Sequence, residues 1–121
     1  MKIDFVADTN FLIYVHEGRE IIEPFLQYNF GISFISKVEL LGFSGISKSE
    51  EAKLTALIKD CFLVEWSSKI KEQTILLRRK YSIKLPDAIV ASTSLVFGIP
   101  LITADKSFSK IKELDLVIFE V

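Results

Sequence analysis

Apolar and polar residues follow two different periods along the chain. Short stretches that are apolar, or that alternate between apolar and polar, predict β-strands at residues 2–7, 32–35, 61–64, 100–103 and 116–119. Apolar residues at helical spacing predict helices at residues 11–15, 19–28, 49–60, 67–81 and 86–97, with further helical turns after Ser36 and Asp105. Strands that alternate with helices indicate an α/β fold in three layers, α/β/α, with a mostly parallel central sheet of about four to five strands.

Capping residues mark several of the helix boundaries. Ser36 and Glu39 have the spacing of a capping box, which predicts that a helix begins just after Ser36. Pro86 suits the first turn of a helix, and Gly98 suits the position where that helix ends. A chain of 121 residues can bury one sizeable core, so we expect a single domain over residues 1–121.

Composition and charge narrow the cellular setting and the partners. Half of the residues are apolar, but none of the apolar stretches is long and uncharged enough to cross a membrane, and the first residues lack a secretory pattern. We therefore expect a cytoplasmic protein. The net charge of −1 gives no general attraction to nucleic acid, so any such contact must be local. Cys61 is the only cysteine, which excludes an internal disulfide and suggests a buried thiol.

Acidic residues occur just after the predicted strands. Asp8 closes the first strand, Asp105 follows the fourth, and Glu39 lies one turn into the helix after the second. Asp87 lies in the first turn of the last long helix. Because ligands of parallel α/β sheets bind at the carboxyl ends of the strands, we expect these carboxylates to converge.

Each of these acids, taken alone, also has an ordinary structural explanation as a helix cap or as a partner of a helix dipole. Asp8, Glu39 and Asp87, however, have apolar neighbours in the sequence, where acids rarely lie uncompensated. Carboxylates a few ångströms apart repel one another unless cations neutralise them. The pattern therefore favours a site for Mg²⁺ or Mn²⁺, which prefer oxygen ligands.

Other chemistries have less support. Zinc is disfavoured, because the only histidine, His16, and the only cysteine, Cys61, have no partner at ligand spacing. We expect His16 to lie at the surface, at the end of its helix. The five glycines form neither a P-loop nor a dinucleotide-binding pattern, and no nucleophile motif of a hydrolase is present.

The four acids lie in sequence elements with a familiar pattern, which read FVADTNFLI at 5–13, ISKVELLG at 35–42, LPDAIVA at 85–91 and LITADKSF at 101–108. In order and spacing they resemble the PIN-domain ribonucleases, and among these the VapC-type toxins of toxin–antitoxin pairs. The resemblance covers essentially the whole chain. It implies a single PIN-like domain and an endoribonuclease that uses Mg²⁺ or Mn²⁺ to activate the attacking water.

The resemblance also implies roles for individual residues. Metal binding falls to Asp8, Glu39, Asp87 and Asp105. Polar positions beside the metal are Thr9, Asn10 and Thr103, with Thr103 the one expected to touch the site, whereas Ser36 matches a position that caps a helix. Phosphate contacts of the RNA are expected from Arg78, Arg79, Lys84 and Lys106. The implied partners are an RNA substrate of the tRNA or rRNA class, a cognate antitoxin that covers the site, and a second copy in a homodimer.

Two alternatives remain at the level of sequence. A catalytically silent module with the same fold would bind RNA or a protein without cleaving it. A receiver-like phosphoacceptor domain has a similar length and acidic strand ends, but it requires an adjacent acid pair after the first strand, where Asp8 stands alone.

Overall fold

A computed structural model describes residues 2–121 of the chain. In this range the strands are β1 (Phe5–Ala7), β2 (Phe30–Ser33), β3 (Phe62–Val64), β4 (Leu101–Thr103) and β5 (Leu116–Ile118). The α-helices are α1 (Thr9–Glu17), α2 (Phe34–Leu41), α3 (Lys48–Lys59), α4 (Ser68–Lys80) and α5 (Leu85–Phe97). The shorter 3₁₀ helices are η1 (Glu20–Phe25) and η2 (Lys106–Lys110).

The strands form one parallel sheet in the order β3-β2-β1-β4-β5. The chain builds outward from β1 to β2 and β3, and then returns to the other side of β1 with β4 and β5. The direction of winding therefore reverses between β1 and β4, which is where open parallel sheets bind ligands. Because Ala7 pairs with Ile102, the next residues of the two segments, Asp8 after β1 and Thr103 at the end of β4, lie side by side.

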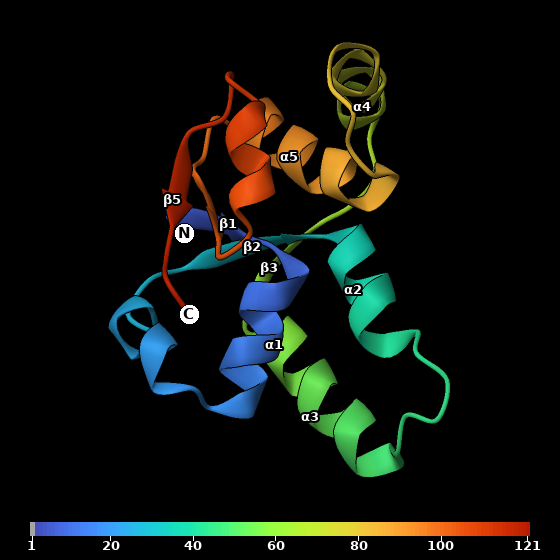
Figure 1. The fold of residues 1–121 in the computed structure, drawn as a ribbon. Coiled ribbons are helices and arrows are strands. Elements are labelled where there is room, and N and C mark those ends of the chain that lie inside the picture. Colours follow the sequence, from blue (N-terminus) through green and yellow to red (C-terminus); the bar gives the residue numbers. More distant parts are fainter. Residues whose placement is uncertain (1) are drawn as a thin grey trace.

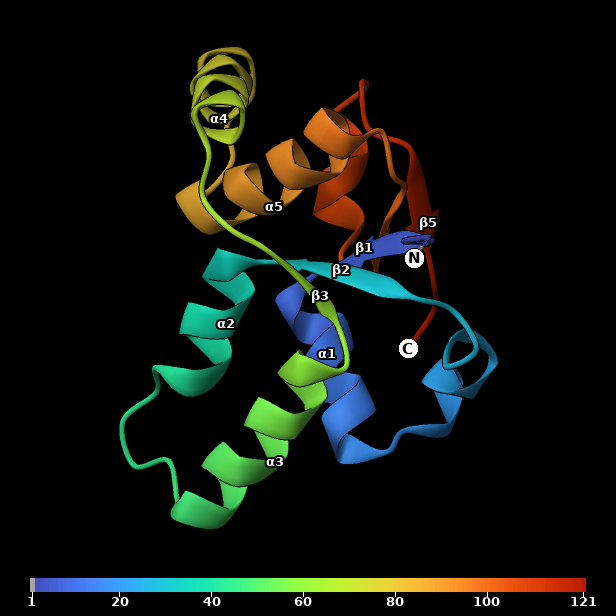
Figure 2. The same ribbon diagram turned by 180° about the vertical axis from the view of Figure 1, so that it is seen from behind.

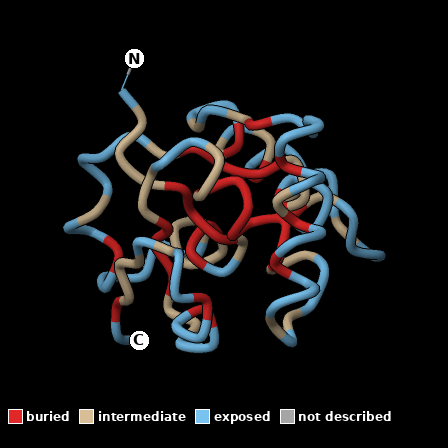
Figure 3. Tube along the Cα trace, turned by 90° about the horizontal axis from the view of Figure 1, so that it is seen from above, coloured by how far each residue is buried: buried red, intermediate tan, exposed pale blue. Residues whose placement is uncertain are grey.

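Helices cover both faces of the sheet. Helices α1 and α3 lie on one face and α4 and α5 on the other (Figures 1 and 2). The alternation of side chains along a strand divides the core accordingly. Val6 and Leu101 pack in the cluster beneath α4 and α5, whereas Ala7 and Ile102 pack in the cluster beneath α1 and α3. The buried segments run through the centre of the molecule (Figure 3). The structure thus confirms the predicted α/β/α layers and parallel sheet.

Two segments differ from the sequence-based prediction. Residues 19–28 were expected to form an ordinary helix, but they form only the 3₁₀ helix η1, because Pro24 has no N–H for a continuous α-helical ladder. The strand expected at residues 32–35 ends at Ser33, and α2 begins at Phe34. None of the helices in residues 2–121 combines the length and the apolar character needed to cross a membrane.

Candidate active site

Four acids line one cavity at the carboxyl edge of the sheet. Asp8 follows β1 and Asp105 follows β4, the strand hydrogen-bonded to β1. Glu39 projects from α2 and Asp87 from the first turn of α5. The cavity has a volume of about 290 Å³, and its lining is completed by Thr9, Asn10, Ile13 and Val90. The convergence expected from parallel strands is therefore present in the structure.

Asp8 is the most buried of these acids, with an exposed fraction of 5%. It is the N-cap of α1, and its Oδ1 accepts a hydrogen bond of 2.9 Å from the amide of Phe11. Its Oδ2 accepts a hydrogen bond of 2.5 Å from the hydroxyl of Thr103, which is fully buried. The same Thr103 oxygen accepts a hydrogen bond of 2.9 Å from the amide of Asp105. Thr103 therefore connects the two strand ends and fixes the orientation of the Asp8 carboxylate.

Glu39 is held by a polar contact with α1. The Thr9 hydroxyl donates to Glu39 Oε1 at 2.6 Å, and it also lies 3.0 Å from the Ser36 hydroxyl. Ser36 was expected to cap α2, and this assignment is wrong, because Ser33 is the N-cap and accepts from the amide of Ile35. Ser36 is instead a buried residue inside α2, where it joins the α1–α2 contact.

Burial and mutual repulsion act on two of the acids. Burial raises the pKa of the Asp8 carboxyl, with smaller contributions from Asp105 and Asp87, and the hydrogen bonds from Thr103 and Phe11 oppose this rise. The pKa of the Asp87 carboxyl is raised by burial first, and then by Asp105 and Glu39. The structure therefore brings the four charges close enough to affect one another.

Two basic side chains, Lys84 and Lys110, lie near the acids. Lys84 and Lys110 lower the pKa of Asp87 and so partly offset the repulsion from the other carboxylates. Both lysines line a second and larger cavity that adjoins the acids.

The side chains around the cavity fit a hard cation in their chemistry, because the carboxylate and hydroxyl groups offer only oxygen ligands. Their arrangement is less complete. Among residues 2–121, no group of three or more acidic, histidine or cysteine side chains is placed to hold one metal ion. Thr103 and Phe11 engage the carboxylate of Asp8, and Thr9 engages that of Glu39. The residue types therefore match a magnesium site, whereas the side chains of residues 2–121 are not arranged around one ion position.

His16 and Cys61 lie outside the acid cavity. His16 lies in the last turn of α1, where its Nε2 is 2.8 Å from Glu50 Oε2, and it lines a neighbouring cavity that also includes Glu39. Cys61 is half-buried, and its Sγ donates to the carbonyl of Leu57. Burial, assisted by Asp60, raises the pKa of the Cys61 thiol to about 11, so the thiol is protonated at neutral pH.

The basic residues proposed to contact RNA are not gathered at one place. Arg78 and Lys84 line the cavity beside Asp87 and Asp105. Arg79 lines a different cavity, between α4 and the first residue of α5, together with Arg78. The ammonium group of Lys106 lies 3.6 Å from Glu120 and does not line either of the cavities that contain the acids.

Sequence reasoning missed the position of Lys110 in the cavity beside the acids. Lys110 lies four residues after Lys106 in the sequence, but only the turn of η2 and the approach of the segment between α4 and α5 bring it to this cavity. Ser107 lines the same cavity and donates its amide to Asp105 Oδ1 at 2.9 Å. Ser107 and Lys110 are three residues apart, the spacing at which side chains align along a 3₁₀ helix, and this spacing was the signal that the sequence offered.

Comparison with known proteins gives a consistent set of relatives. The family model of the PIN domain matches residues 5–114. A toxin–antitoxin complex from Klebsiella pneumoniae contains a chain with 27% identity and a TM-score of 0.85, and the match covers 98% of this chain and 100% of that one. No curated protein matches the sequence.

Two further solved structures share the fold at lower identity. VapBC2 from Rickettsia felis, bound to a DNA fragment from its promoter, has a TM-score of 0.87 at 20% identity and covers 98% of this chain and 100% of that chain. DNA-bound VapBC from Salmonella typhimurium has a TM-score of 0.84 at 19% identity and covers 97% of this chain and 98% of that chain.

Proposed function

Because the chain belongs to the PIN-domain family, we propose that it is a metal-dependent endoribonuclease and the toxin of a toxin–antitoxin pair. The observation that supports this most directly is the single cavity lined by Asp8, Glu39, Asp87 and Asp105 at the reversal point of the sheet. We further propose that residues 1–121 form one PIN-like domain. Because the chain belongs to this family, the receiver-like phosphoacceptor domain is no longer an alternative.

We assign the metal-binding role to the four acids. A bound Mg²⁺ or Mn²⁺ ion would neutralise the carboxylates and provide a water of lowered pKa to attack the phosphodiester. Thr103 keeps the Asp8 carboxylate turned toward the cavity, and Thr9 does the same for Glu39. Asn10 lies in the lining beside them. Thr103 and Thr9 thus orient the acids, and the attacking nucleophile in this proposal is the water.

The substrate and partners in this proposal are an RNA of the tRNA or rRNA class, a cognate antitoxin and a second copy of the chain. The complexes formed by the similar chain from Klebsiella pneumoniae support the antitoxin. The candidate phosphate contacts are Arg78, Arg79, Lys84 and Lys106, of which Arg78 and Lys84 line a cavity together with Asp87 and Asp105. Because cellular tRNA and rRNA are the substrates, the cytoplasm is the proposed place of action.

One observation favours a second candidate, a catalytically silent module that binds RNA or a protein. Within residues 2–121, the acids do not form a group placed to hold an ion. A silent module would keep the fold and the RNA affinity without turnover.

Cleavage of a pool of cellular RNA tests the two candidates. The purified chain, freed of any co-purifying partner, is incubated with Mg²⁺, Mn²⁺ or EDTA, beside Asp8→Asn and Asp4→Asn. Asp4 is the matched control, because it lies before β1 and its carboxylate accepts from the amide of Asn29, at the end of the strand away from Asp8.

A nuclease cleaves only with metal, loses this activity in Asp8→Asn and retains it in Asp4→Asn. Equal loss in both variants would contradict the placement of the site. A folded wild-type chain that binds both metal and RNA without cleaving would support the silent module.

A further inference from the structure

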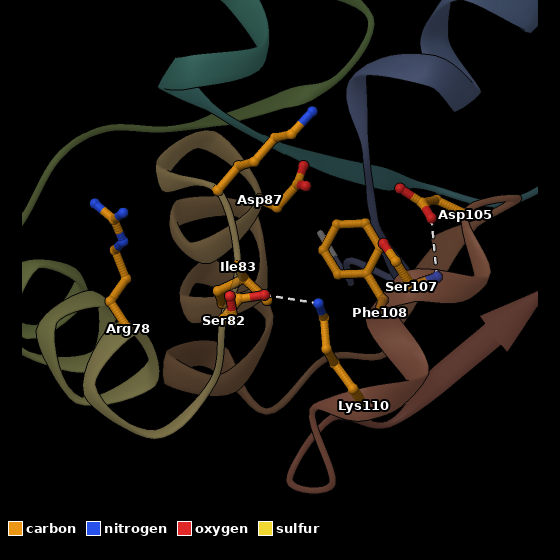
Figure 4. A pocket seen from close by; sticks show the side chains of 9 residues that line it. Arg78, Ser82, Ile83, Asp87, Asp105, Ser107, Phe108 and Lys110 are labelled. Carbon is orange, nitrogen blue, oxygen red and sulfur yellow. Dashed lines mark hydrogen bonds between the residues drawn. The ribbon is translucent and has the colours of Figure 1, made fainter.

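A groove with basic walls continues from the acid cavity. It has a volume of about 610 Å³, and its lining includes Arg78, Ser82, Lys84, Asp87, Asp105 and Lys110. Asp87 and Asp105 also line the acid cavity, so the two hollows share a border. The volume is in the range of cavities that hold ligands of drug size, which is also the size of a nucleotide. In Figure 4 the two acids face the groove, and Lys110 reaches across toward Ser82.

Three cations from different parts of the chain line this groove. Arg78 comes from the last turn of α4, Lys84 from the segment before α5, and Lys110 from η2. Among residues 2–121, none of the three forms an ion pair with an acidic side chain. Their charge is therefore available to a ligand.

Lys110 is fixed in position without losing its charge. Its Nζ donates to the carbonyl of Ser82 at 2.7 Å, across the groove from η2. An ammonium group has three donors, so two remain for a ligand. Because a neutral acceptor already orders this long side chain, less of its conformational entropy is lost when a ligand binds.

The two walls of the groove are also joined to each other next to Lys110. The hydroxyl of Tyr81, which follows α4, contacts the carboxylate of Glu113 and accepts from the amide of Lys112 at 3.3 Å. Lys80 forms an ion pair of 3.3 Å with the same Glu113. The end of α4 and the segment between η2 and β5 are thus connected independently of any ligand, so the groove is formed in the free protein.

A polyanionic substrate requires such cations beside the acids. In the proposed nuclease, metal neutralises the phosphate that is cleaved, but the neighbouring phosphates of the strand must still pass Asp87 and Asp105. The net charge of −1 provides no general attraction that offsets this repulsion. Lys84 and Lys110 line the same groove as Asp87 and Asp105, the two acids that it shares with the acid cavity, so their charge lies beside the border between the two hollows.

We propose that this groove binds the backbone of a single RNA strand next to the cleaved bond, with Arg78, Lys84 and Lys110 each contacting a phosphate that is not cleaved. The proposal rests on the proposed function and adds to it the path of the substrate. It gives Lys110 the role that sequence reasoning gave to Arg79 and Lys106. Arg79 lines another cavity, and Lys106 is paired with Glu120.

The test measures RNA binding and cleavage separately. Binding of a labelled single-stranded RNA is followed by fluorescence anisotropy over a series of salt concentrations, in the Asp8→Asn background, for Arg78→Ala, Lys84→Ala and Lys110→Ala. The matched control is Lys53→Ala, which removes an exposed cation from α3 on the other face of the sheet. Lys84→Ala is expected to fold normally, because the Lys84 side chain forms no hydrogen bond that caps α5.

Each groove variant is expected to reduce the slope of log Kd against log salt by about 0.7, the contribution of one phosphate contact on a single strand. In the otherwise wild-type chain, each is expected to raise KM for RNA cleavage with little change in kcat. Lys110→Arg keeps the charge, so its KM is expected to stay close to that of the wild type.

Slopes and KM values equal to those of Lys53→Ala would overturn the proposal. Loss of binding to the partner protein with unchanged RNA parameters would also overturn it and would assign the groove to a protein. Absence of metal-dependent cleavage in the wild type, with groove-dependent RNA binding intact, would count against the nuclease alone.

Discussion

Thr103 is the residue on which the geometry of the site depends most directly. Its hydroxyl donates to Asp8 and accepts from the amide of Asp105, and it has no access to solvent. Thr103→Val keeps the shape but leaves both partners unsatisfied in a buried place, so we expect a loss of about 1–3 kcal/mol in the free energy of unfolding. Cleavage should decline with it, because Asp8 loses its fixed orientation.

Thr103→Ser restores the hydroxyl and serves as the control for this prediction. Urea denaturation and cleavage rates, measured over a metal titration, compare the two variants. If Thr103→Val were as stable and as active as Thr103→Ser, the hydrogen bonds through this hydroxyl would have no role in the site.

Asp87 provides a prediction on pH dependence. Its folded-state pKa is raised by burial and by the other acids, above the ordinary value of 3.8. Below pH 3.8 the carboxyl is protonated in both states. As the pH rises toward the folded-state pKa, the unfolded chain ionises first, so the free energy of unfolding falls. Asp87→Asn removes this loss.

In EDTA, the stability of Asp87→Asn relative to wild type should therefore increase as the pH rises from below 3.8 through the folded-state pKa, and then level off. We expect a gain of about 0.5 kcal/mol, at the low end for relieved charge repulsion, because the carboxylate is half-exposed. Chemical denaturation at a series of pH values measures it. A difference that is constant with pH would show that the ionised Asp87 causes no such loss.

At the scale of elements, the sequence predicts most helices well because their ends depend on local chemistry. Pro86 lies at the start of α5 and Gly98 caps its end with a φ of 64°, as the residue types suggest. The prediction that Ser36 caps α2 was wrong for a physical reason. Ser33 has no glutamate or glutamine three residues on, yet it caps α2, because the choice between the two serines depends on where β2 stops pairing with its neighbours, which is a tertiary property.

Gly98 gives the prediction for this scale. A Cβ at this position meets no other atom within 4 Å, so the cost of Gly98→Ala comes from the left-handed backbone alone. We expect a loss of about 1–2 kcal/mol in the free energy of unfolding, with unchanged cleavage at temperatures where the protein is folded. Thermal denaturation and a cleavage assay on the same sample measure both. A loss of activity in the folded variant would mean that the end of α5 affects the site.

At the scale of the whole molecule, the sequence could predict the acid cavity but not the groove beside it. Asp8 and Asp105 follow strands, and parallel strands bring their carboxyl ends together, so composition and topology suffice for these two. The position of Lys110 depends on how η2 packs against the segment between α4 and α5, and no periodicity encodes that contact. The order of β1 and β4 as neighbours is equally invisible in the sequence, although it determines that Thr103 reaches Asp8.

The stability of the whole molecule should respond to the proposed metal. Burial and the neighbouring carboxylates raise the pKa values of Asp8 and Asp87, which means that ionised acids oppose folding when no cation is bound. A cation that binds only the folded state stabilises it by about 2.7 kcal/mol when its concentration is a hundred times its Kd. Thermal denaturation with increasing Mn²⁺ or Mg²⁺ should therefore raise the Tm of the wild type and of Asp4→Asn, and leave that of Asp8→Asn nearly unchanged. Equal responses in all three proteins would place metal binding away from the acid cavity, and no response in any of them would favour the silent module, because a set of repelling carboxylates without a cation has no catalytic use.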